Sequence, residues 1–335
     1  MPSPDVVVVG DINVDILARV DHYPSPGGHA LAEELRMESG GSAANTAAAL
    51  GHLGLDVVML GRIGDDPLAE WALRGLRSSA VDVSHVRRDA EATTGVMFVT
   101  VTPDGERTMF GGRGANRRLS PDDIDATAIE QARWLHLSGY ALLSESGQAA
   151  VRRAVEVARQ AGVPISLDAG MGPATLAWRA AVVEVAAVSD LFLPNQAEVE
   201  LLTGKQTPAR AARWLQARGV RTMVVKLGAK GCHVSDGSEE WTTPGFKIDP
   251  VDSTGAGDAF DAGFIAGRLA GLSLRASALL ANALGALTTT VVGAGGALSG
   301  PARVLQFVKE QRDDGRWAEW AGELDLVLGW LARSS

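Results

Sequence analysis

The sequence contains one cysteine, no excess of positive charge and no long hydrophobic run. Cys232 is the only cysteine among 335 residues, so no disulfide can form within the chain, which fits a reducing compartment. The first residues lack the basic segment of a signal peptide, and the apolar run Val6–Val9 is far too short to span a membrane. We therefore expect a cytoplasmic protein with no membrane partner.

The charge balance argues against a nucleic-acid partner. The formal net charge is −9 and the pI is about 5.2, so no general basic field surrounds the chain. The local pairs Arg117-Arg118 and Arg152-Arg153 are typical of solvated helix or loop faces. Apolar residues make up 46% of the chain, which is enough for the core of one large α/β domain or of two smaller ones.

Strand-like and helix-like segments alternate along most of the chain. The run Val6–Val9, followed by Gly10, is typical of a buried parallel strand because helices would cover both of its faces. Further strands are expected at 57–60, 134–137, 164–167, 191–193 and 223–226, and helices at 43–53, 67–77, 147–161, 209–218, 258–270 and 274–292. This order predicts an α/β fold with a doubly wound, mostly parallel sheet and helices on both faces.

Two parts of the chain depart from this alternation. Residues 31–37 and 94–102 have β character with mixed polarity, and 95–102 can form a hairpin with 107–110 through the turn Pro103-Asp104-Gly105. These segments predict a small sheet that projects from the main body. The tail 316–335 carries Trp317, Trp320, Leu324, Val327, Leu328 and Leu331 at helical spacing. It predicts an amphipathic helix that packs on its own domain or forms a subunit contact.

The most informative motif is the run DSTGAGDAF at 252–260. Its glycines open directly into a predicted helix, whose unpaired N–H groups and positive dipole potential suit a phosphate. Phosphate would repel the carboxylate of Asp258, so its position indicates proton transfer during phosphoryl transfer; the alternative is a favourable first-turn charge. No Lys-Ser/Thr pair follows, which excludes a Walker A loop, and GDIN at 10–13 is no dinucleotide fingerprint.

A second glycine cluster, GGSAAN at 40–45, also leads into a predicted helix. Asn45 places an amide, which can donate and accept hydrogen bonds, in the first turn of that helix. Asn13 and Asp15 follow the first strand two residues apart, so in extended chain their side chains point the same way. Together with Gly41, these residues suit a polyhydroxylated ligand, and turn chemistry is the alternative for Asn13 and Asp15.

A third cluster, Asn195 and Glu198, follows the strand expected at 191–193. The spacing of three residues places both side chains on one side of a helix start. One interpretation is a capping box, in which the two side chains satisfy the N–H groups of the helix. The other is a water-mediated Mg²⁺ and phosphate site, because Mg²⁺ usually keeps several of its waters.

These three clusters, in this order, resemble the ribokinase-like PfkB family of carbohydrate kinases over roughly residues 5–312. The DSTGAGD signature at 252–258 is highly specific, GGxxxN at 40–45 is moderately so, and NxxE at 195–198 is weak alone. The resemblance implies that Asp258 is the general base and that the backbone amides of Gly255, Ala256 and Gly257 form an anion hole for the transferred phosphoryl group. It also implies a substrate-closing lid at about 16–37 and 93–112.

The resemblance assigns further expected roles. Asn13, Asp15, Gly41 and Asn45 would hold the sugar. ATP would be bordered by Lys226, Gly228 and Gly231, with Asn282 beside the adenine, and Asn195 and Glu198 would organise Mg²⁺ and phosphate. In members activated by monovalent cations, carbonyl groups near Asp252 and Thr254 help to bind K⁺, which extends as an expectation to this chain. Family members often form homodimers through the lid.

The resemblance leaves the substrate open. HLSG at 136–139 is similar to members that phosphorylate 2-keto-3-deoxygluconate, and Arg113 could meet a sugar-acid carboxylate, although it also fits an ordinary loop arginine. The Tyr-Tyr-Arg stretch of those members is replaced by FGGR at 110–113, and RGAN at 113–116 is closer to ribokinase-type members. The pattern favours a primary hydroxyl of a neutral sugar or a ribosyl group; sugar-acid kinase, nucleoside kinase and a non-catalytic sugar or nucleotide sensor are the alternatives.

Overall fold

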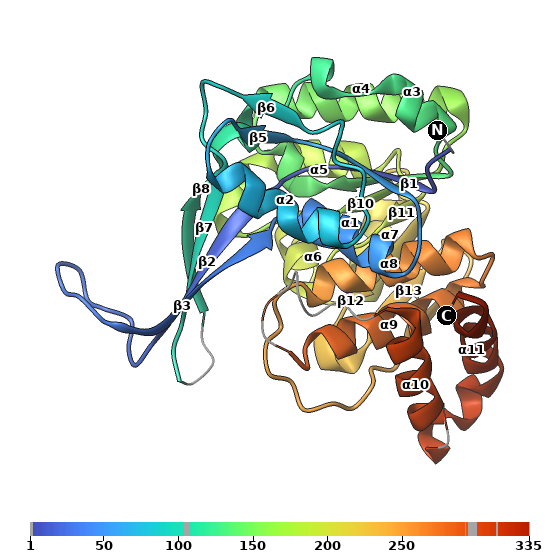
Figure 1. Ribbon diagram of the computed structural model, residues 1–335. Helices are drawn as coiled ribbons and strands as arrows, with labels where there is room; N and C mark the ends of the chain where they lie inside the picture. The colour runs from blue at the N-terminus through green and yellow to red at the C-terminus, as the bar shows by residue number, and fades with distance from the viewer. Residues whose placement is uncertain (1–2, 104–106, 292, 294–299, 313, 335) are drawn as a thin grey trace.

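The computed structural model describes residues 3–103, 107–291, 293, 300–312 and 314–334 (Figure 1). Its centre is an eight-stranded sheet in the order β14-β13-β12-β11-β10-β9-β1-β4. The strands are β1 (Val6–Val9), β4 (Val57–Leu60), β9 (Trp134–Ser138), β10 (Ile165–Asp168), β11 (Leu191–Phe192), β12 (Thr222–Lys226), β13 (Cys232–Ser235) and β14 (Glu240–Thr243). The pairs from β4 through β12 are parallel, and β13 and β14 add an antiparallel hairpin at one edge.

The valine run of β1 is buried on both faces, as a continuous apolar strand in a doubly wound sheet should be. Val6 and Val8 contribute to the core cluster on one face, and Val7 and Val9 to the cluster on the other. The predicted mostly parallel α/β architecture is therefore confirmed. The hairpin β13–β14 was not predicted, because its two strands are only four residues each and interrupt the strand–helix alternation.

Helices cover both faces of the sheet. The first layer contains α1 (Ser42–His52), α2 (Leu68–Ser78), α8 (Ala256–Leu269), α9 (Leu274–Thr288), α10 (Pro301–Arg312) and α11 (Ala321–Ser334). The second contains α3 (Ala126–Gln131), α4 (Glu145–Ala161), α5 (Arg179–Ala186), α6 (Gln196–Thr203) and α7 (Pro208–Gln216). In the described part of the chain, no helix combines the length and apolar character needed to cross a membrane.

Helix α9 ends earlier than the expected 274–292. Its last residue is Thr288, where three consecutive threonine hydroxyls bond back to carbonyls of the last turns. Such back-bonding by β-branched residues competes with continuation of the helix. Residue 292 itself lies outside the described residues.

A small sheet projects from the body at one side (Figure 1) and is called the lid below. Its four strands run in the order β3-β2-β7-β8, with β2 at Asn13–Val20, β3 at Ala32–Gly40, β7 at Gly95–Val101 and β8 at Arg107–Gly112. Strands β7 and β8 pair antiparallel as the expected hairpin, whose turn at 103–105 lies partly outside the described residues. Strand β2 begins at Asn13 rather than near 16, so Asn13 and Asp15 belong to the lid itself.

The C-terminal tail packs against its own chain. The expected single helix from 316 is instead a 3-10 turn at Gly315–Trp320 followed by α11, because the Asp314 carboxylate accepts the N–H of Arg316 and starts the tighter turn. The Trp317 ring stacks on Phe246 at 4.4 Å between centroids. Trp317, Trp320, Leu324, Val327 and Leu331 are buried in the same core cluster as α8 and α9.

Replacing Leu324 by alanine tests how strongly the tail supports the core. Leu324 is 0% exposed and Leu326, on the same helix, is 53% exposed. We expect Leu324→Ala to lower the free energy of unfolding by about 2–5 kcal/mol because it removes apolar contacts and leaves a cavity. The matched Leu326→Ala should change it by about 0.5 kcal/mol or less. Urea titration measures both, and equal effects would show that α11 does not pack as described.

Candidate active site

The starts of helices α1 and α8 meet at the carboxylate of Asp258. Helix α8 follows Gly255, which adopts a left-handed conformation with φ 74°, and Asp258 lies in its first turn. One carboxylate oxygen accepts the Ser42 hydroxyl at 2.8 Å, and the other accepts the Asn45 side-chain amide at 2.9 Å. The two predicted glycine clusters, more than 200 residues apart in the sequence, therefore form one site.

The surroundings of Asp258 raise its pKa from 3.8 to about 7. Withdrawal from solvent is the largest cause, and the nearby Asp168 carboxylate adds to it. The hydrogen bonds from Asn45 and Ser42 and the charge of Lys226 act in the opposite direction. A carboxylate with a pKa near neutrality is a much stronger base than an ordinary aspartate.

The start of α1 depends on Gly41 and on Asp11. Gly41 has φ 103°, and a Cβ at this position would lie 2.6 Å from the carbonyl oxygen of Asp11. The Asp11 carboxylate accepts the N–H groups of Ser42 at 3.2 Å and Ala43 at 3.4 Å, and the Ser138 hydroxyl at 3.1 Å. No role for Asp11 was predicted from the sequence, because a helix cap contributed from 31 residues away has no local signature.

Asn13 and Asp15 stand at the foot of the lid, beside the Asp258 site. The side-chain oxygen of Asn13 accepts the side-chain amide of Asn116 at 2.8 Å, and Asn116 also binds the backbone of Ile12. The pKa of Asp15 is raised to about 7, first by burial and then by Asp11, Glu38 and Asp258. A Cβ on Gly40 would lie 2.3 Å from the Asp15 carboxyl carbon, so glycine at 40 makes room for that carboxylate.

Arg113 follows the last lid strand and is held by the body of the protein. It donates to the carbonyl oxygen of Tyr140 at 2.9 Å, and its guanidinium lies 5.4 Å from the centre of the Tyr140 ring. The side chain is half-buried rather than an exposed loop arginine. Tyr140 has a raised pKa, because burial and the neighbouring carboxylates disfavour the phenolate.

Lys226 is the centre of a buried ion network. Its ammonium donates to Asp168 at 2.8 Å and to both oxygens of Asp261 at 3.0 Å. Burial alone would lower the lysine pKa, but Asp168 and Asp261 raise it, so the lysine stays charged. Lys226 was expected at the nucleotide, and neither carboxylate was predicted to contact it. Only the i, i+3 spacing of Asp258 and Asp261 on α8 could have indicated one of them.

Asn195 and Glu198 form a capping box at the start of α6. Glu198 N–H donates to the Asn195 oxygen at 3.0 Å, and Asn195 N–H donates to the Glu198 carboxylate at 2.7 Å. The second Glu198 oxygen accepts Met171 N–H at 3.0 Å. Burial, followed by the charge of Asp168, raises the pKa of Glu198 to about 7. No three His, Cys, Asp or Glu side chains within the described residues could hold a metal ion directly.

A cavity of about 540 Å³ lies beside the start of α8. Four of the residues expected at the nucleotide line it together with two expected for the anion hole: Lys226, Gly228, Gly231, Asn282, Ala256 and Gly257. The Asn282 amide donates to the Pro244 carbonyl at 3.0 Å, which fixes this side of the cavity. Gly231 has φ 91°, and a Cβ there would lie 2.1 Å from the Thr243 carbonyl oxygen, so no larger residue fits.

The segment before α8 is held by the side chain of Asp252. Its carboxylate accepts the N–H of Thr254 at 2.9 Å, the Thr254 hydroxyl at 2.7 Å and the N–H of Gly293 at 3.0 Å. These bonds join the loop before α8 to the loop after α9. The carbonyl groups expected to contact K⁺ belong to this segment.

The fold and this site define a carbohydrate kinase. Residues 3–299 match the model of the pfkB family carbohydrate kinase, and the chain belongs to that family. This membership favours the enzyme over the non-catalytic sensor.

Individual relatives extend over nearly the whole chain. The ATP-dependent ribose-1-phosphate kinase of Halopiger xanaduensis is 34% identical over 308 residues, covering 92% of this chain and 99% of its own. The structure of Arabidopsis thaliana ribokinase with ribose and ATP has a TM-score of 0.80 at 27% identity, covering 92% and 99% of the two chains. An E. coli protein classed as ribokinase II, solved with ATP and Mg²⁺, has a TM-score of 0.82 at 26% identity with the same coverage.

Replacing Lys226 by methionine tests the buried ion network. The change leaves Asp168 and Asp261 without their common cation, so we expect the free energy of unfolding to fall by about 3–5 kcal/mol. Lys230→Met is the matched control, because Lys230 is exposed on the neighbouring turn. Thermal and urea unfolding measure both variants. An unfolding midpoint for Lys226→Met equal to that of the control would contradict the network.

Proposed function

We propose that this protein transfers the γ-phosphoryl group of ATP to a primary hydroxyl group of a small sugar. The observation that carries the proposal is the position of Asp258. Its carboxylate lies between the cavity that borders the start of α8 and the polar side chains at the foot of the lid. ATP on one side and the sugar hydroxyl on the other would then meet at the Asp258 carboxylate, whose pKa is about 7.

Asp258 would act as the general base. It would accept the proton of the attacking hydroxyl as the new O–P bond forms and the bond to the leaving ADP oxygen breaks. Ser42 and Asn45 each occupy one carboxylate oxygen and so fix the direction of the remaining lone pairs. The first-turn backbone of Gly255, Ala256 and Gly257 would supply the anion hole, since the N–H groups of a helix start have no partner within the helix. The Ala256 N–H donates to the Ser253 carbonyl oxygen at 3.3 Å and would have to exchange that bond for the phosphoryl group.

The acceptor sugar would bind between the lid and α1. Asp15 offers carboxylate oxygens that accept from hydroxyl groups, and Asn13 and Asn45 offer amides that both donate and accept. Gly41 would let the sugar approach the backbone at the start of α1. Arg113 would border this side from the end of β8, with part of its guanidinium already engaged by Tyr140.

The nucleotide would occupy the cavity lined by Lys226, Gly228, Gly231 and Asn282. Mg²⁺, when bound with the nucleotide, neutralises phosphate charge and helps to orient the transferred group. Asn195 and Glu198 fit a contact through water, because the capping box uses their atoms locally and no direct metal cluster exists among the described residues. Carbonyl groups near Asp252 and Thr254 would contact K⁺.

The relatives leave the acceptor open. The Halopiger relative is named for ribose 1-phosphate, and the Arabidopsis ribokinase was solved with ribose. Proteins similar to this chain are thus associated with both a phosphorylated and an unphosphorylated sugar. A neutral sugar, a sugar acid and a nucleoside all offer the primary hydroxyl that the proposal needs.

The substitution Asp258→Asn tests whether Asp258 is the general base. Asp258→Asn keeps the size and both hydrogen-bonding positions but removes the basic carboxylate, so we expect kcat to fall by about 10²–10⁴-fold with ATP binding retained. Asp122→Asn, an exposed aspartate on another surface, is the control. Steady-state kinetics and nucleotide titration measure the two effects. Retention of more than roughly a tenth of the wild-type kcat would refute the assignment.

The pH profile gives a second measure of the same group. The base must be ionised, and its pKa is about 7, so kcat should decline as the pH falls below that value. The Ser42 hydroxyl lowers this pKa by stabilising the carboxylate. Ser42→Ala should therefore move the acidic limb to higher pH, and an unmoved limb would argue against Asp258 as the titrating group.

We also propose a homodimer through the lid. Leu35, Phe98 and Phe110 are large, exposed apolar residues, and strand alternation places them on the lid face opposite Asp15. The two phenylalanine rings stack at 5.3 Å. Light scattering should give twice 34.9 kDa for the wild type, and Phe98→Arg should reduce it to the monomer mass. Val188→Arg, at an exposed apolar position on the body, should stay dimeric; a monomeric wild type would contradict the dimer.

A further inference from the structure

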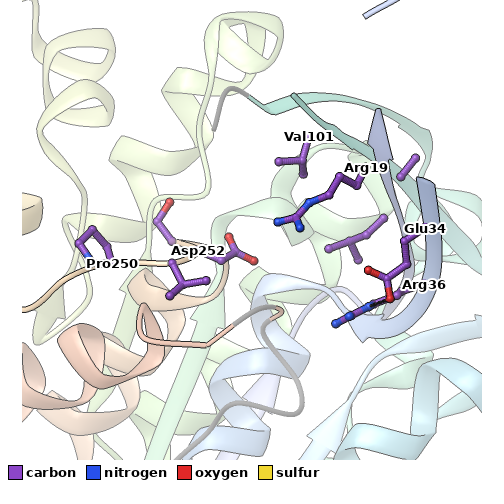
Figure 2. Close-up of a pocket in the computed structure, with 10 residues that line it drawn as sticks. Arg19, Glu34, Arg36, Val101, Pro250 and Asp252 are labelled. Carbon is purple, nitrogen blue, oxygen red and sulfur yellow. Dashed lines mark hydrogen bonds and ion pairs between the residues drawn. The ribbon is translucent and has the colours of Figure 1, made fainter. Parts of the chain in front are cut away.

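A second hollow lies between the lid and the segment before α8 (Figure 2). We call it the lid pocket; its volume is about 290 Å³. Strands β2, β3 and β7 form one wall, and residues 250–253 form the other. Figure 2 shows Arg19 and Arg36 reaching from two lid strands toward the segment that carries Pro250 and Asp252.

Strand alternation places this pocket on the same lid face as the proposed sugar residues. Asn13, Asp15 and Arg19 are separated by even numbers of residues along β2, so their side chains share a face. Glu38 pairs with Asp15 across β3, and Arg36 pairs with Leu17, one step further out. On this face of the lid, the carboxylates of Asp15 and Glu38 lie nearer the body, and the guanidinium groups of Arg19 and Arg36 lie farther out. Two residues along a strand span about 7 Å.

The guanidinium groups keep donors for a ligand, whereas the carboxylates of the pocket are engaged. Within the described part of the chain, Arg19 makes no side-chain hydrogen bond or ion pair, and Arg36 uses only its Nε, which donates to Glu34 at 2.6 Å. Glu34 is thus paired, and Asp252 is held by Thr254 and Gly293. Free donors from two arginines on neighbouring strands suit an anion with several acceptor oxygens, and phosphate is such an anion.

We propose that the lid pocket binds a phosphate group that the acceptor sugar already carries. This inference rests on the sugar kinase activity proposed above and names its substrate class: a sugar monophosphate with a free primary hydroxyl. The hydroxyl groups of the sugar lie at Asp15, where a phosphate would be repelled, and the phosphate lies further out at Arg19 and Arg36. The bound sugar monophosphate thus extends along the lid from the Asp15 carboxylate to the guanidinium groups of Arg19 and Arg36.

The reaction balances without any additional reagent. The primary hydroxyl oxygen of the sugar monophosphate bonds to the γ-phosphorus, and the bond between that phosphorus and the bridging oxygen breaks. ADP leaves with the electron pair, and the hydroxyl proton passes to Asp258. The products are ADP and a sugar bisphosphate.

A phosphate of the nucleotide is the other source of the same chemistry. Pro250 and Ser253 line both the lid pocket and the nucleotide cavity, so the 250–253 segment separates the two hollows. The arginines belong to the lid side only. A phosphate in the lid pocket therefore shares its compartment with the sugar residues, and we assign it to the acceptor.

The test compares D-ribose with α-D-ribose 1-phosphate as acceptors, because the phosphate on C1 is the group that the lid pocket is proposed to bind. Wild-type enzyme should prefer ribose 1-phosphate in kcat/KM. Arg19→Gln and Arg36→Gln should each lower the ratio of kcat/KM for ribose 1-phosphate to that for ribose by about 10- to 100-fold, mainly through KM, since each removes a charged hydrogen bond. Arg303→Gln, which removes the same charge from an exposed position on α10, should leave the ratio within about twofold.

The other outcomes separate this inference from the proposed function. Phosphorylation of ribose with no preference for ribose 1-phosphate overturns the lid pocket and leaves the sugar kinase standing. An increase in the KM for ATP that is equal with both acceptors assigns the arginines to the nucleotide and also overturns it. Preference for 2-keto-3-deoxygluconate over both sugars assigns the pocket to a carboxylate. No ATP consumption with any acceptor overturns both proposals.

Discussion

The contact between the first turn of α1 and the carboxylate of Asp258 joins the two halves of this molecule. Helix α1 follows the lid strand β3 directly, so its start positions the lid relative to the body. Helix α8 follows the segment 250–255, which borders both hollows of the site. Ser42 and Asn45 bind the two oxygens of one carboxylate, and the proposed placement of ATP and sugar depends on these two hydrogen bonds.

Asp258 is one of three neighbouring carboxylates that surround the buried ammonium group of Lys226. Asp168, Asp258 and Asp261 lie around Lys226, which forms direct ion pairs with Asp168 and Asp261 but not with Asp258. Asp261 is fully buried, and its pairing with Lys226 offsets the cost of removing its charge from water. Asp258 receives only neutral hydrogen bonds, and its withdrawal from solvent is the largest cause of its raised pKa. Asp168 and Asp261 thus supply the ion pairs of the network, and Asp258 is the carboxylate that we propose as the base.

The sequence predicted the features that depend on residues close together in the chain. The strand–helix alternation gave the sheet, and the glycine-rich runs at 40–45 and 252–258 gave the two helix starts, because a left-handed turn before a helix needs glycine at Gly41 and Gly255. Contacts between residues that are far apart in the sequence could not be predicted. Asp11, in the connection between β1 and β2, caps a helix that begins 31 residues later, and Asp168 and Asp261 meet only around Lys226. The hairpin β13–β14 is too short to show a period. The lid arginines became informative only once the strand register aligned them with Asp15.

The central claim is that the fold holds Asp258 as a base that titrates near neutral pH. A ¹³C NMR titration of aspartate labelled at the side-chain carboxyl, with the Asp258 signal assigned by its loss in Asp258→Asn, measures this directly. The account predicts a midpoint about three pH units above the ordinary aspartate value of 3.8, at about 7. A midpoint close to 3.8 would show that the site neither desolvates this carboxylate nor crowds it with charge, and would contradict the account.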